Sequence, residues 1–252
     1  MASQPDETLR LRDAGDSAVT LEFGNRVAPE LVARVAAAEH ALDAARASGA
    51  LQGVVETVPA FRSLTVLYDP LVTSRAVLDP QLRALLAQAG TTSAATPRHW
   101  RLPVCYGGDF GADLLDVAAA TGLSPEAVVQ LHAGTVFTVY MLGFMPGFPF
   151  MGLLPGALSV PRRREPRVRV PAGSVSITGP LSAIYPWESP GGWQLLGRCP
   201  VPLFDAAAAN PVLLAPGDRV GFEPVGADRY AEIDAALRAG QLLAGNFQVP
   251  AA

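Results

Sequence analysis

The segment "GFMPGFPFMGLLP", residues 143–155, is the most informative stretch for the fold, because it is strongly apolar yet rich in helix breakers. It holds three phenylalanines, two methionines, three prolines, three glycines and no charge. A membrane-spanning helix needs about 20 apolar residues, whereas the apolar, proline-free run covers only residues 136–145. The prolines that follow would break such a helix. The segment is therefore a buried, turn-rich connection or the wall of a pocket.

The region around this segment has the same character. Residues 141–202 contain eleven prolines and nine glycines, which stiffen a chain without regular hydrogen bonding. Strand-like runs occur at residues 100–106, 134–142, 173–178, 192–198 and 211–222. Short strands separated by Gly/Pro turns are typical of a β-barrel or β-sandwich. One short helix is expected at residues 124–132, capped by Ser124. We therefore predict a β domain over residues 97–252.

The N-terminal part of the chain has a different pattern. Alternating runs predict strands at residues 17–23, 53–58 and 63–68. One helix is predicted from Pro29 to Gly49, and a second is predicted to follow Pro80. The predicted order is β-β-α-β-β-α, in which one of the two leading strands is not assigned to residues. It indicates a small α+β sandwich over residues 1–92, with the helices on one face of the sheet. Residues 90–98 are expected to form the linker.

Composition excludes several functional classes. The 252 residues are 50% hydrophobic and 17% charged, which indicates a globular chain, and the net charge of −4 gives no reason to expect nucleic acid or a membrane as a partner. The polar N-terminus "MASQPDETLRLRD" has no apolar signal core, so a cytoplasmic location is expected. Cys105 and Cys199 are expected to be reduced structural thiols. No metal-binding motif is found, and no metal site is expected.

All nineteen basic residues are arginine. A Walker A loop and a Schiff-base lysine are both excluded, because each needs a lysine. Any bound anion must be held by arginine forks, backbone amides or helix N-termini.

Candidate binding residues concentrate in residues 162–198. Five arginines fall within residues 162–169, and Arg167 and Arg169 lie nearest the following turn. A solvated charged loop is the alternative for residues 162–164. The segment "IYPWESPGGWQLLGR" adds Tyr185, Trp187, Glu188, Trp193 and Arg198, with two glycines that allow close backbone approach.

His132 and Ser174 have catalytic side chains but no supporting motif. His132 ends a short predicted helix, where a capping or surface role competes with acid-base catalysis. Ser174 is a nucleophile by residue type, but no neighbouring residue in sequence supplies its base. A place at the start of a strand is the alternative for Ser174.

Four segments together resemble one family: "HAGTVFTVYMLGFMPGFPFMGLL", "PRRREPRVRVPAGSV", "IYPWESPGGWQLLGR" and "LFD…PVLLAPGDRVGFEPV". The chain is identified as a member of the family known as allophanate hydrolase subunit 1 or as the 5-oxoprolinase B subunit, which includes an inhibitor of a sporulation histidine kinase. The segments "LRDAGDSAVTLEFG", "VVETVPAFRSLTVLYDP" and "LPVCYGGDFGADLLDVA" extend the resemblance over nearly the whole chain.

The resemblance implies an α+β N-terminal domain followed by a cyclophilin-like β-barrel. It further implies a second cyclophilin-like subunit (the C-type subunit of 5-oxoprolinase) as partner, an A-type barrel subunit, and ATP with Mg²⁺ bound together with a partner. By resemblance, the cleft residues are Phe144, Pro146, Phe148, Arg167, Ser174, Tyr185, Trp193 and Arg198. Arg167 and Arg198 are expected to hold a carboxylate or phosphate, and Tyr185 and Ser174 to donate to a developing oxyanion.

The chain departs from the family at one motif. Where the family reads Gly-x-Gln-Thr-Gly-Ile-Tyr-Pro, this chain reads "GPLSAIYP", with Leu181, Ser182 and Ala183 at the variable positions. Leucine cannot replace the hydrogen bonds of a buried amide. A family threonine is also replaced, by Cys199.

Three functions are considered for this sequence. The leading one is a subunit of an ATP-dependent amide or lactam hydrolase acting on 5-oxoproline, a small-molecule substrate. The second is a regulatory protein that inhibits a sensor histidine kinase through the same cleft. Peptidyl-prolyl isomerisation has only the analogy of the fold behind it. In the enzyme, we expect the outer aromatics Phe148 and Phe150 to contact a partner protein.

Overall fold

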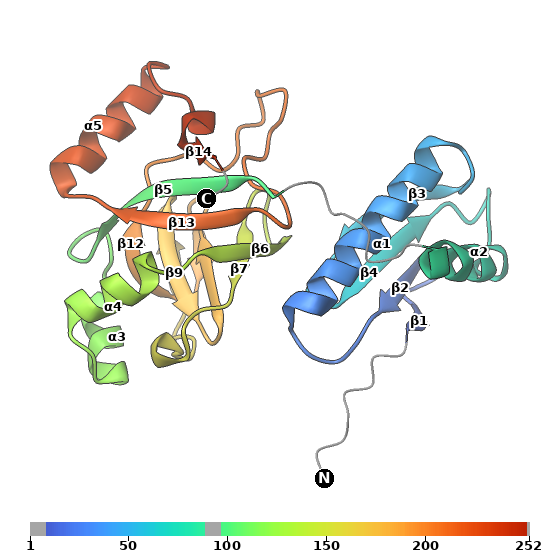
Figure 1. Cartoon of the computed structure of the whole chain (residues 1–252), viewed down its shortest axis with the longest axis horizontal. Helices are drawn as coiled ribbons and strands as arrows, with labels where there is room; N and C mark the ends of the chain where they lie inside the picture. Colours follow the sequence, from blue (N-terminus) through green and yellow to red (C-terminus); the bar gives the residue numbers. More distant parts are fainter. Residues whose placement is uncertain (1–8, 89–96, 251–252) are drawn as a thin grey trace, which may run out of the picture. The chain divides into compact units, whose positions relative to one another are not determined.

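The computed structural model describes residues 9–88 and 97–250, and it divides the chain into two compact units, Met1–Thr96 and Pro97–Ala252 (Figure 1). The expected linker falls mainly on residues 89–96, which lie outside the described residues. Among the described helices, none combines the length and apolar character that a membrane crossing requires.

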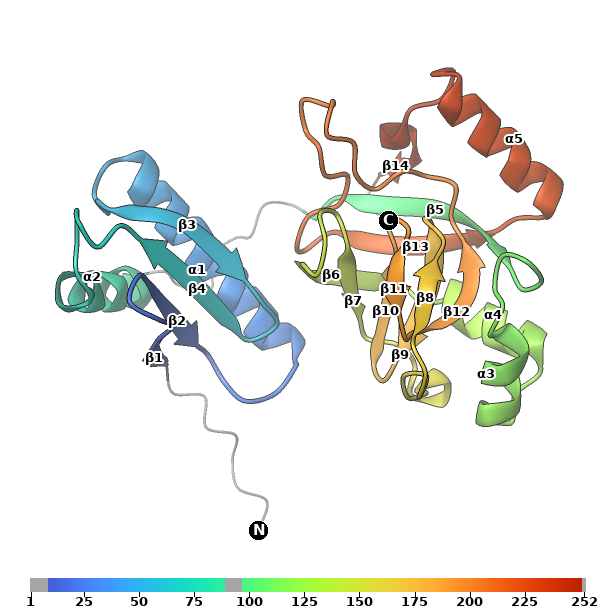
Figure 2. The ribbon, with the colours of Figure 1, turned by 180° about the vertical axis from the view of Figure 1, so that it is seen from behind.

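The N-terminal unit is an antiparallel four-stranded sheet with the order β1-β2-β4-β3. Its strands are β1 (Arg10–Asp13), β2 (Ala18–Glu22), β3 (Val54–Pro59) and β4 (Ser63–Tyr68). The helices α1 (Pro29–Ala47) and α2 (Arg75–Gln88) complete it. Figures 1 and 2 show α1 lying across one face of this sheet. The predicted α+β unit is confirmed.

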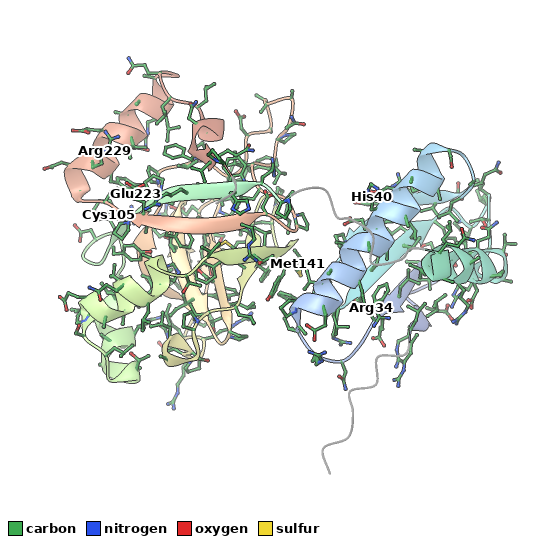
Figure 3. All side chains as sticks on the ribbon, in the orientation of Figure 1. Arg34, His40, Cys105, Met141, Glu223 and Arg229 are labelled. Atoms are coloured by element: carbon green, nitrogen blue, oxygen red, sulfur yellow. The ribbon has the colours of Figure 1, made fainter. Side chains whose placement is uncertain are left out.

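The alternation of buried and partly exposed residues along β4 explains why α1 packs on the sheet. Leu64, Val66 and Tyr68 are buried, and they share a core with Leu31 and Leu42 of α1. Each completely buried leucine contributes about 1.5–3 kcal/mol relative to an exposed one. The period-2 pattern of the strand therefore meets the apolar stripe of the helix in one core; Figure 3 draws the side chains on the ribbon.

The prediction for α2 was wrong at its start. The helix begins at Arg75 and contains Pro80, instead of starting after it. The backbone amides of Val77 and Leu78 bond to the Ser74 carbonyl, so the first turn forms ahead of the proline. Leu78 is completely buried, and this burial offsets the strain that proline introduces.

The C-terminal unit is built on a closed barrel of seven strands. In barrel order these are β12 (Gln194–Arg198), β9 (Ser174–Thr178), β10 (Leu181–Ile184), β7 (Pro149–Gly152), β6 (Phe137–Leu142), β13 (Arg219–Pro224) and β5 (His99–Tyr106). The barrel closes through the pairing of β12 with β5, and β13 and β5 are parallel. The predicted β-barrel is confirmed.

Further elements surround the barrel. They are α3 (Leu114–Thr121), α4 (Pro125–Ala133), η1 (Gly156–Leu158), β8 (Arg167–Val170), β11 (Ser189–Gly191), α5 (Ala227–Arg238), η2 (Ala244–Phe247) and β14 (Gln248–Val249). The strands β8 and β11 pair with each other and form a two-stranded arm, visible in Figure 2 in front of β9 and β10. Ser124 caps α4 as predicted, accepting from the Ala127 amide at 3.2 Å.

The strand predicted over residues 211–222 is present only from Arg219 onward. The preceding residues form a turn because the buried Asp218 carboxylate accepts hydrogen bonds from the Ala215 amide and the Trp100 indole. Arg98 completes the arrangement with an ion pair at 2.6 Å. A buried carboxylate needs such partners, so its bonds decide the local backbone.

His132 lies inside the barrel core, completely buried and stacked on Phe222 at 4.9 Å. Its Nδ1 lies 2.8 Å from the Tyr106 hydroxyl, and its Nε2 lies 3.0 Å from Ser182 Oγ. Ser182 donates its own proton to the Ser176 carbonyl. This order assigns Nε2–H as the donor and Nδ1 as the acceptor. Burial lowers the pKa of His132 to about 3. The expected capping or surface role of His132 is therefore wrong.

Neutral His132 predicts a specific loss of stability in acid. The unfolded chain protonates this histidine near pH 6.5, whereas the folded chain does so only near the lowered pKa of about 3. Stability is therefore complete above pH 6.5 and falls as the pH drops, by about 1.4 kcal/mol per unit. Urea unfolding at pH 7 and pH 5 should show a difference that is about 2 kcal/mol smaller in His132→Gln than in the wild type. Equal pH dependence of the two proteins would contradict the assignment.

Candidate active site

An aromatic cavity of about 390 Å³ opens beside the two-stranded arm. We call it the aromatic cavity; it is lined by Phe144, Phe148, Phe150, Arg162, Pro166, Tyr185, Pro190, Gly191, Gly192 and Trp193. Four of the residues expected in the cleft, Phe144, Phe148, Tyr185 and Trp193, are thus brought together. Residues 143–155 form one wall of this cavity.

Phe148 is the centre of the aromatic wall. Its ring meets Tyr185 edge-on at 5.1 Å and Trp193 at 6.0 Å, and it tilts against Phe150 at 4.9 Å. Only 2% of Phe148 is exposed. Edge-to-face aromatic pairs contribute about 0.5–1.5 kcal/mol beyond their buried area. Phe148 is therefore a core residue, and the prediction that it is an outer aromatic was wrong.

Phe144 is the outward-facing aromatic of this segment. It is 68% exposed and meets Phe148 edge-on at 5.5 Å. Its φ of 67° lies in the left-handed region, which costs a non-glycine residue of order 1–2 kcal/mol. The strained backbone places an apolar ring at the mouth of the aromatic cavity, in contact with solvent.

Tyr185 supplies a protonated hydroxyl to the aromatic cavity. The residue is 2% exposed, and burial raises its pKa, while the backbone of Trp193 and the charges of Arg162 and Arg167 act in the opposite direction. The phenol therefore remains a hydrogen-bond donor at neutral pH. A Cβ atom on Gly191 would lie 2.3 Å from the Tyr185 hydroxyl oxygen, so only glycine permits this position.

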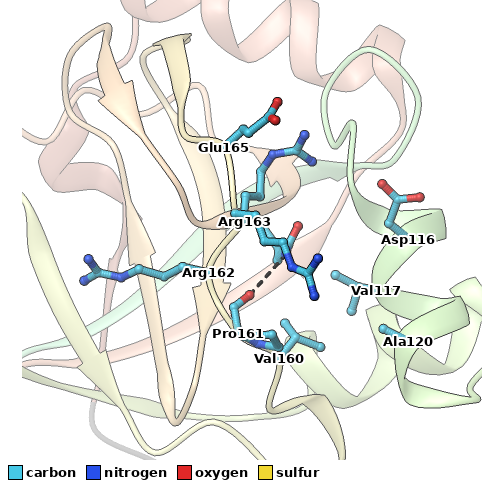
Figure 4. A pocket seen from close by; sticks show the side chains of 10 residues that line it. Asp116, Val117, Ala120, Val160, Pro161, Arg162, Arg163 and Glu165 are labelled. Atoms are coloured by element: carbon cyan, nitrogen blue, oxygen red, sulfur yellow. Dashed lines mark hydrogen bonds between the residues drawn. The ribbon is translucent and has the colours of Figure 1, made fainter.

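Arg162 brings a cation to the aromatic cavity. Its guanidinium lies over the Trp193 ring, 5.9 Å from the ring centroid. Figure 4 shows its side chain extending to the side opposite Asp116 and Val117. Sequence reasoning had given residues 162–164 less weight than Arg167, and the structure reverses this order for the cavity lining. Cation–π contacts of this kind hold an arginine without neutralising it.

Arg167 is held by a buried carboxylate that sequence reasoning missed. Asp113 is 1% exposed, and its Oδ1 accepts from Arg167 at 2.5 Å and from Arg163 at 2.8 Å. Its Oδ2 accepts from the Leu195 amide at 2.7 Å. We call Asp113, Arg163, Arg167 and the Leu195 amide the Asp113 clamp. The only signal in the sequence was an acidic residue directly before a short helix.

The remaining expected residues lie outside the lining of the aromatic cavity. Ser174 is completely buried on β9, and its hydroxyl has no hydrogen-bond partner among the described residues. Arg198 lies over the Phe110 ring and donates to the Asp109 carbonyl at 3.2 Å. Pro146 accepts a hydrogen bond from the Trp187 indole through its carbonyl.

The chain matches a known family and several proteins. Residues 9–214 match the family described as carboxyltransferase domain, subdomain C and D. The chain is 38% identical over 231 residues to the 5-oxoprolinase B subunit of Bacillus subtilis, covering 88% of this chain and 95% of the relative. It is 44% identical over 176 residues to the protein of the same name from Escherichia coli O157:H7, covering 69% of this chain and 79% of the relative.

Solved structures agree with these matches. TTHA0988 superposes with a TM-score of 0.74 at 40% identity over 86% of this chain, which spans only 41% of the TTHA0988 chain. The urea amidolyase of Kluyveromyces lactis has a TM-score of 0.76 at 20% identity, over 96% of this chain and 16% of that one, and it supports the fold alone. The family match over residues 9–214 and the near-complete alignment with the Bacillus protein place this chain in the 5-oxoprolinase B-subunit family of carboxyltransferase-domain proteins.

Proposed function

We propose that the chain is the B subunit of a 5-oxoprolinase, which opens the lactam of 5-oxoproline to glutamate at the expense of ATP. As a member of this family, the chain is a subunit of an ATP-dependent amidohydrolase. The observation that carries the finer proposal is the aromatic cavity, where the guanidinium of Arg162, which has no ion pair among the described residues, and the protonated hydroxyl of Tyr185 lie between aromatic walls. The enzyme name of the relatives favours this reading over inhibition of a histidine kinase.

The chemistry of the aromatic cavity suits a small ring that carries a carboxylate. Phe148 and Trp193 offer apolar faces to the ring methylenes. Arg162 would bind the carboxylate, since arginine forks match carboxylate geometry. Tyr185 would donate to the lactam carbonyl and to the oxyanion that forms when the amide is attacked. These roles require side chains in fixed positions. Tyr185 and Trp193 meet this requirement because both are almost completely buried.

The residues that depart from the family motif, Leu181, Ser182 and Ala183, have structural contacts of their own beside the proposed site. Leu181 packs against the aromatic cluster that contains Phe148 and Tyr185, and Ala183 is buried in the same cluster. Ser182 is occupied by its hydrogen bond with His132. An apolar residue at position 181 therefore stabilises the wall, and the contacts to the substrate amide fall to Tyr185 instead.

The complete enzyme is proposed to need partner proteins. The proposed assembly includes a second cyclophilin-like subunit that shares the site and a barrel-type subunit that completes the reaction. ATP with Mg²⁺ supplies the driving force for hydrolysis of an otherwise stable lactam. The direct experiment is to measure ATP hydrolysis dependent on 5-oxoproline, using this chain with and without the partner subunits from the same organism. We expect stimulation in the full mixture, and no stimulation would reject the proposal.

Gly191 and Gly192 provide a matched pair of variants. Gly191→Ala would force the Tyr185 hydroxyl aside, whereas a Cβ on Gly192 would lie 3.6 Å from Pro166, an ordinary contact. We expect Gly191→Ala to lower the oxoproline-dependent rate of the complete enzyme by about 100-fold, the effect of removing one oxyanion donor. Gly192→Ala should retain activity within a few-fold, with both variants checked for folding by circular dichroism. Equal rates for the two variants would exclude Tyr185 from the role assigned above.

Phe144 is predicted to lie in the contact with a partner protein. Because it is 68% exposed and apolar, Phe144→Arg should leave the isolated chain folded and weaken co-purification with the second cyclophilin-like subunit. A buried, unpaired charge in the interface would cost several kcal/mol. The control is Leu71→Arg, which adds the same charge at an apolar residue that is 95% exposed in the N-terminal unit. Undiminished co-purification of Phe144→Arg would place the interface elsewhere.

A further inference from the structure

A second cavity, of about 420 Å³, lies between α3 and residues 162–169, which we call the arginine-rich segment (Figure 4). We call it the polar cavity; it is lined by Asp116, Val117, Ala120, Val160, Pro161, Arg162, Arg163, Arg164, Glu165 and Gln194. Gln194 fixes one side by donating to the Pro161 carbonyl at 3.1 Å. The polar cavity differs in chemistry from the aromatic cavity, because charged side chains of both signs surround it.

The charged side chains around the polar cavity are only partly paired, and three of them, Asp116, Arg164 and Glu165, are exposed to solvent. Within residues 9–88 and 97–250, Arg164, Asp116 and Glu165 form no ion pair and no side-chain hydrogen bond, although they line one cavity. Arg163 is paired with Asp113 through its Nη1, but its Nε is buried and without a partner among the described residues. Unsatisfied buried donors on cationic groups are costly, and bound ligands usually remove that cost.

The Asp113 clamp leaves arginine donors near the polar cavity without a full set of partners. Two guanidiniums, of Arg163 and Arg167, share the single carboxylate of Asp113. Arg167 also has a buried Nη1 without a partner among the described residues. Arg164 adds a third guanidinium, and the carboxylates of Asp116 and Glu165 in the lining balance its charge and that of the clamp. A phosphoryl group entering the cavity would meet the guanidinium of Arg163, which its bond to Asp113 already orients, and such orientation favours binding.

We propose that the polar cavity binds a phosphoryl group, with Arg163 and Arg164 as its donors. This inference rests on the proposed function, because the ATP-dependent reaction uses a phosphoryl compound as substrate and releases one as product. The cavity is larger than a lone carboxylate requires. Asp116 and Glu165 would repel a bare anion, but they suit the Mg²⁺ ion that accompanies a nucleotide phosphate chain. The polar cavity therefore favours the magnesium-bound form.

The two cavities share the backbone of one segment. Arg162 lines both, while its guanidinium extends toward Trp193 and Arg163 lies on the side of Asp116. The Arg163 amide donates to the Gly192 carbonyl at 2.7 Å, which ties this segment to the wall of the aromatic cavity. A phosphoryl group in the polar cavity would thus lie across a single chain segment from the proposed lactam site.

The test is a calorimetric titration of the purified full chain with MgATP, MgADP and inorganic phosphate. We expect binding that Arg164→Ala weakens by about tenfold or more, the usual effect of losing a charge-assisted hydrogen bond. The matched control is Arg169→Ala, which removes the same charge from an exposed arginine of the same cluster that is paired with Glu188. Arg169→Ala should leave the affinity unchanged. Equal weakening by both variants indicates binding by net charge alone and overturns the proposal.

Further arms identify the source of the phosphoryl group. If the site takes the nucleotide, MgATP binds more tightly than phosphate and Asp116→Asn reduces the advantage of MgATP over metal-free ATP. Phosphate binding as tight as that of MgATP, still lost in Arg164→Ala, identifies the product phosphate as the ligand. Absence of all binding, both in the chain alone and in the complex with its partners, overturns the inference. Oxoproline-dependent ATP hydrolysis by the wild-type complex tests the proposed function separately.

Discussion

The shared carboxylate of Asp113 is the interaction on which the architecture of the site depends. It is 1% exposed, and it joins the start of α3, the arginine-rich segment and β12 through three hydrogen bonds. A buried carboxylate tolerates this position only with such partners, and removing one partner of a buried pair commonly costs about 3–5 kcal/mol. The arginines gain their orientation from the same bonds. One residue therefore fixes the wall between the aromatic and polar cavities.

Packing around the two-stranded arm supplies the second constraint. The arm covers the outer face of β9, β10 and β12, and the rings of Phe148, Tyr185 and Trp193 fill the space beneath it. The lack of a side chain at Gly191 makes room for the Tyr185 hydroxyl. The barrel core, by contrast, contains His132 in a closed set of hydrogen bonds, and its buried residues Val117 and Val160 form the apolar side of the polar cavity. Rigid walls and a rigid barrel together hold the polar groups in place.

Sequence patterns predicted the layers of the fold well, because periodicity reports burial directly. The run at residues 63–68 became β4 with its predicted bounds, and the proline- and glycine-rich region became the barrel with its loops. Helices α3 and α5 were missed. Helix α3 buries Leu114, Val117 and Ala118 but has only eight residues, too few for a periodic pattern to stand out. Helix α5 buries only Ile233, so it carries no strong apolar stripe. The start of α2 was misplaced because burial of Leu78 outweighed the proline signal.

The lining of the aromatic cavity was predicted in part, for a different reason. Aromatic residues near the Gly-Gly pair were found because their residue types and order are distinctive. Asp113 and the orientation of Arg162 could not be found, because they depend on contacts between segments far apart in the sequence, such as the pair of Asp113 and Arg163, 50 residues apart. His132 was misjudged because its position at a helix end suggested solvent, while the barrel folds over it. The residues that were predicted are distinctive in the local sequence, whereas those that were missed depend on long-range pairing, which no local pattern encodes.

A double-mutant cycle between Asp113 and Arg167 tests the central claim most directly. The free energy of unfolding in urea would be measured for the wild type, Asp113→Asn, Arg167→Gln and the double variant. If the carboxylate holds the guanidinium as the structure indicates, the coupling energy should be about 2 kcal/mol, within the range for contacting charged residues. Effects of the two substitutions that add within about 0.5 kcal/mol would contradict the account, because independent residues behave in that way.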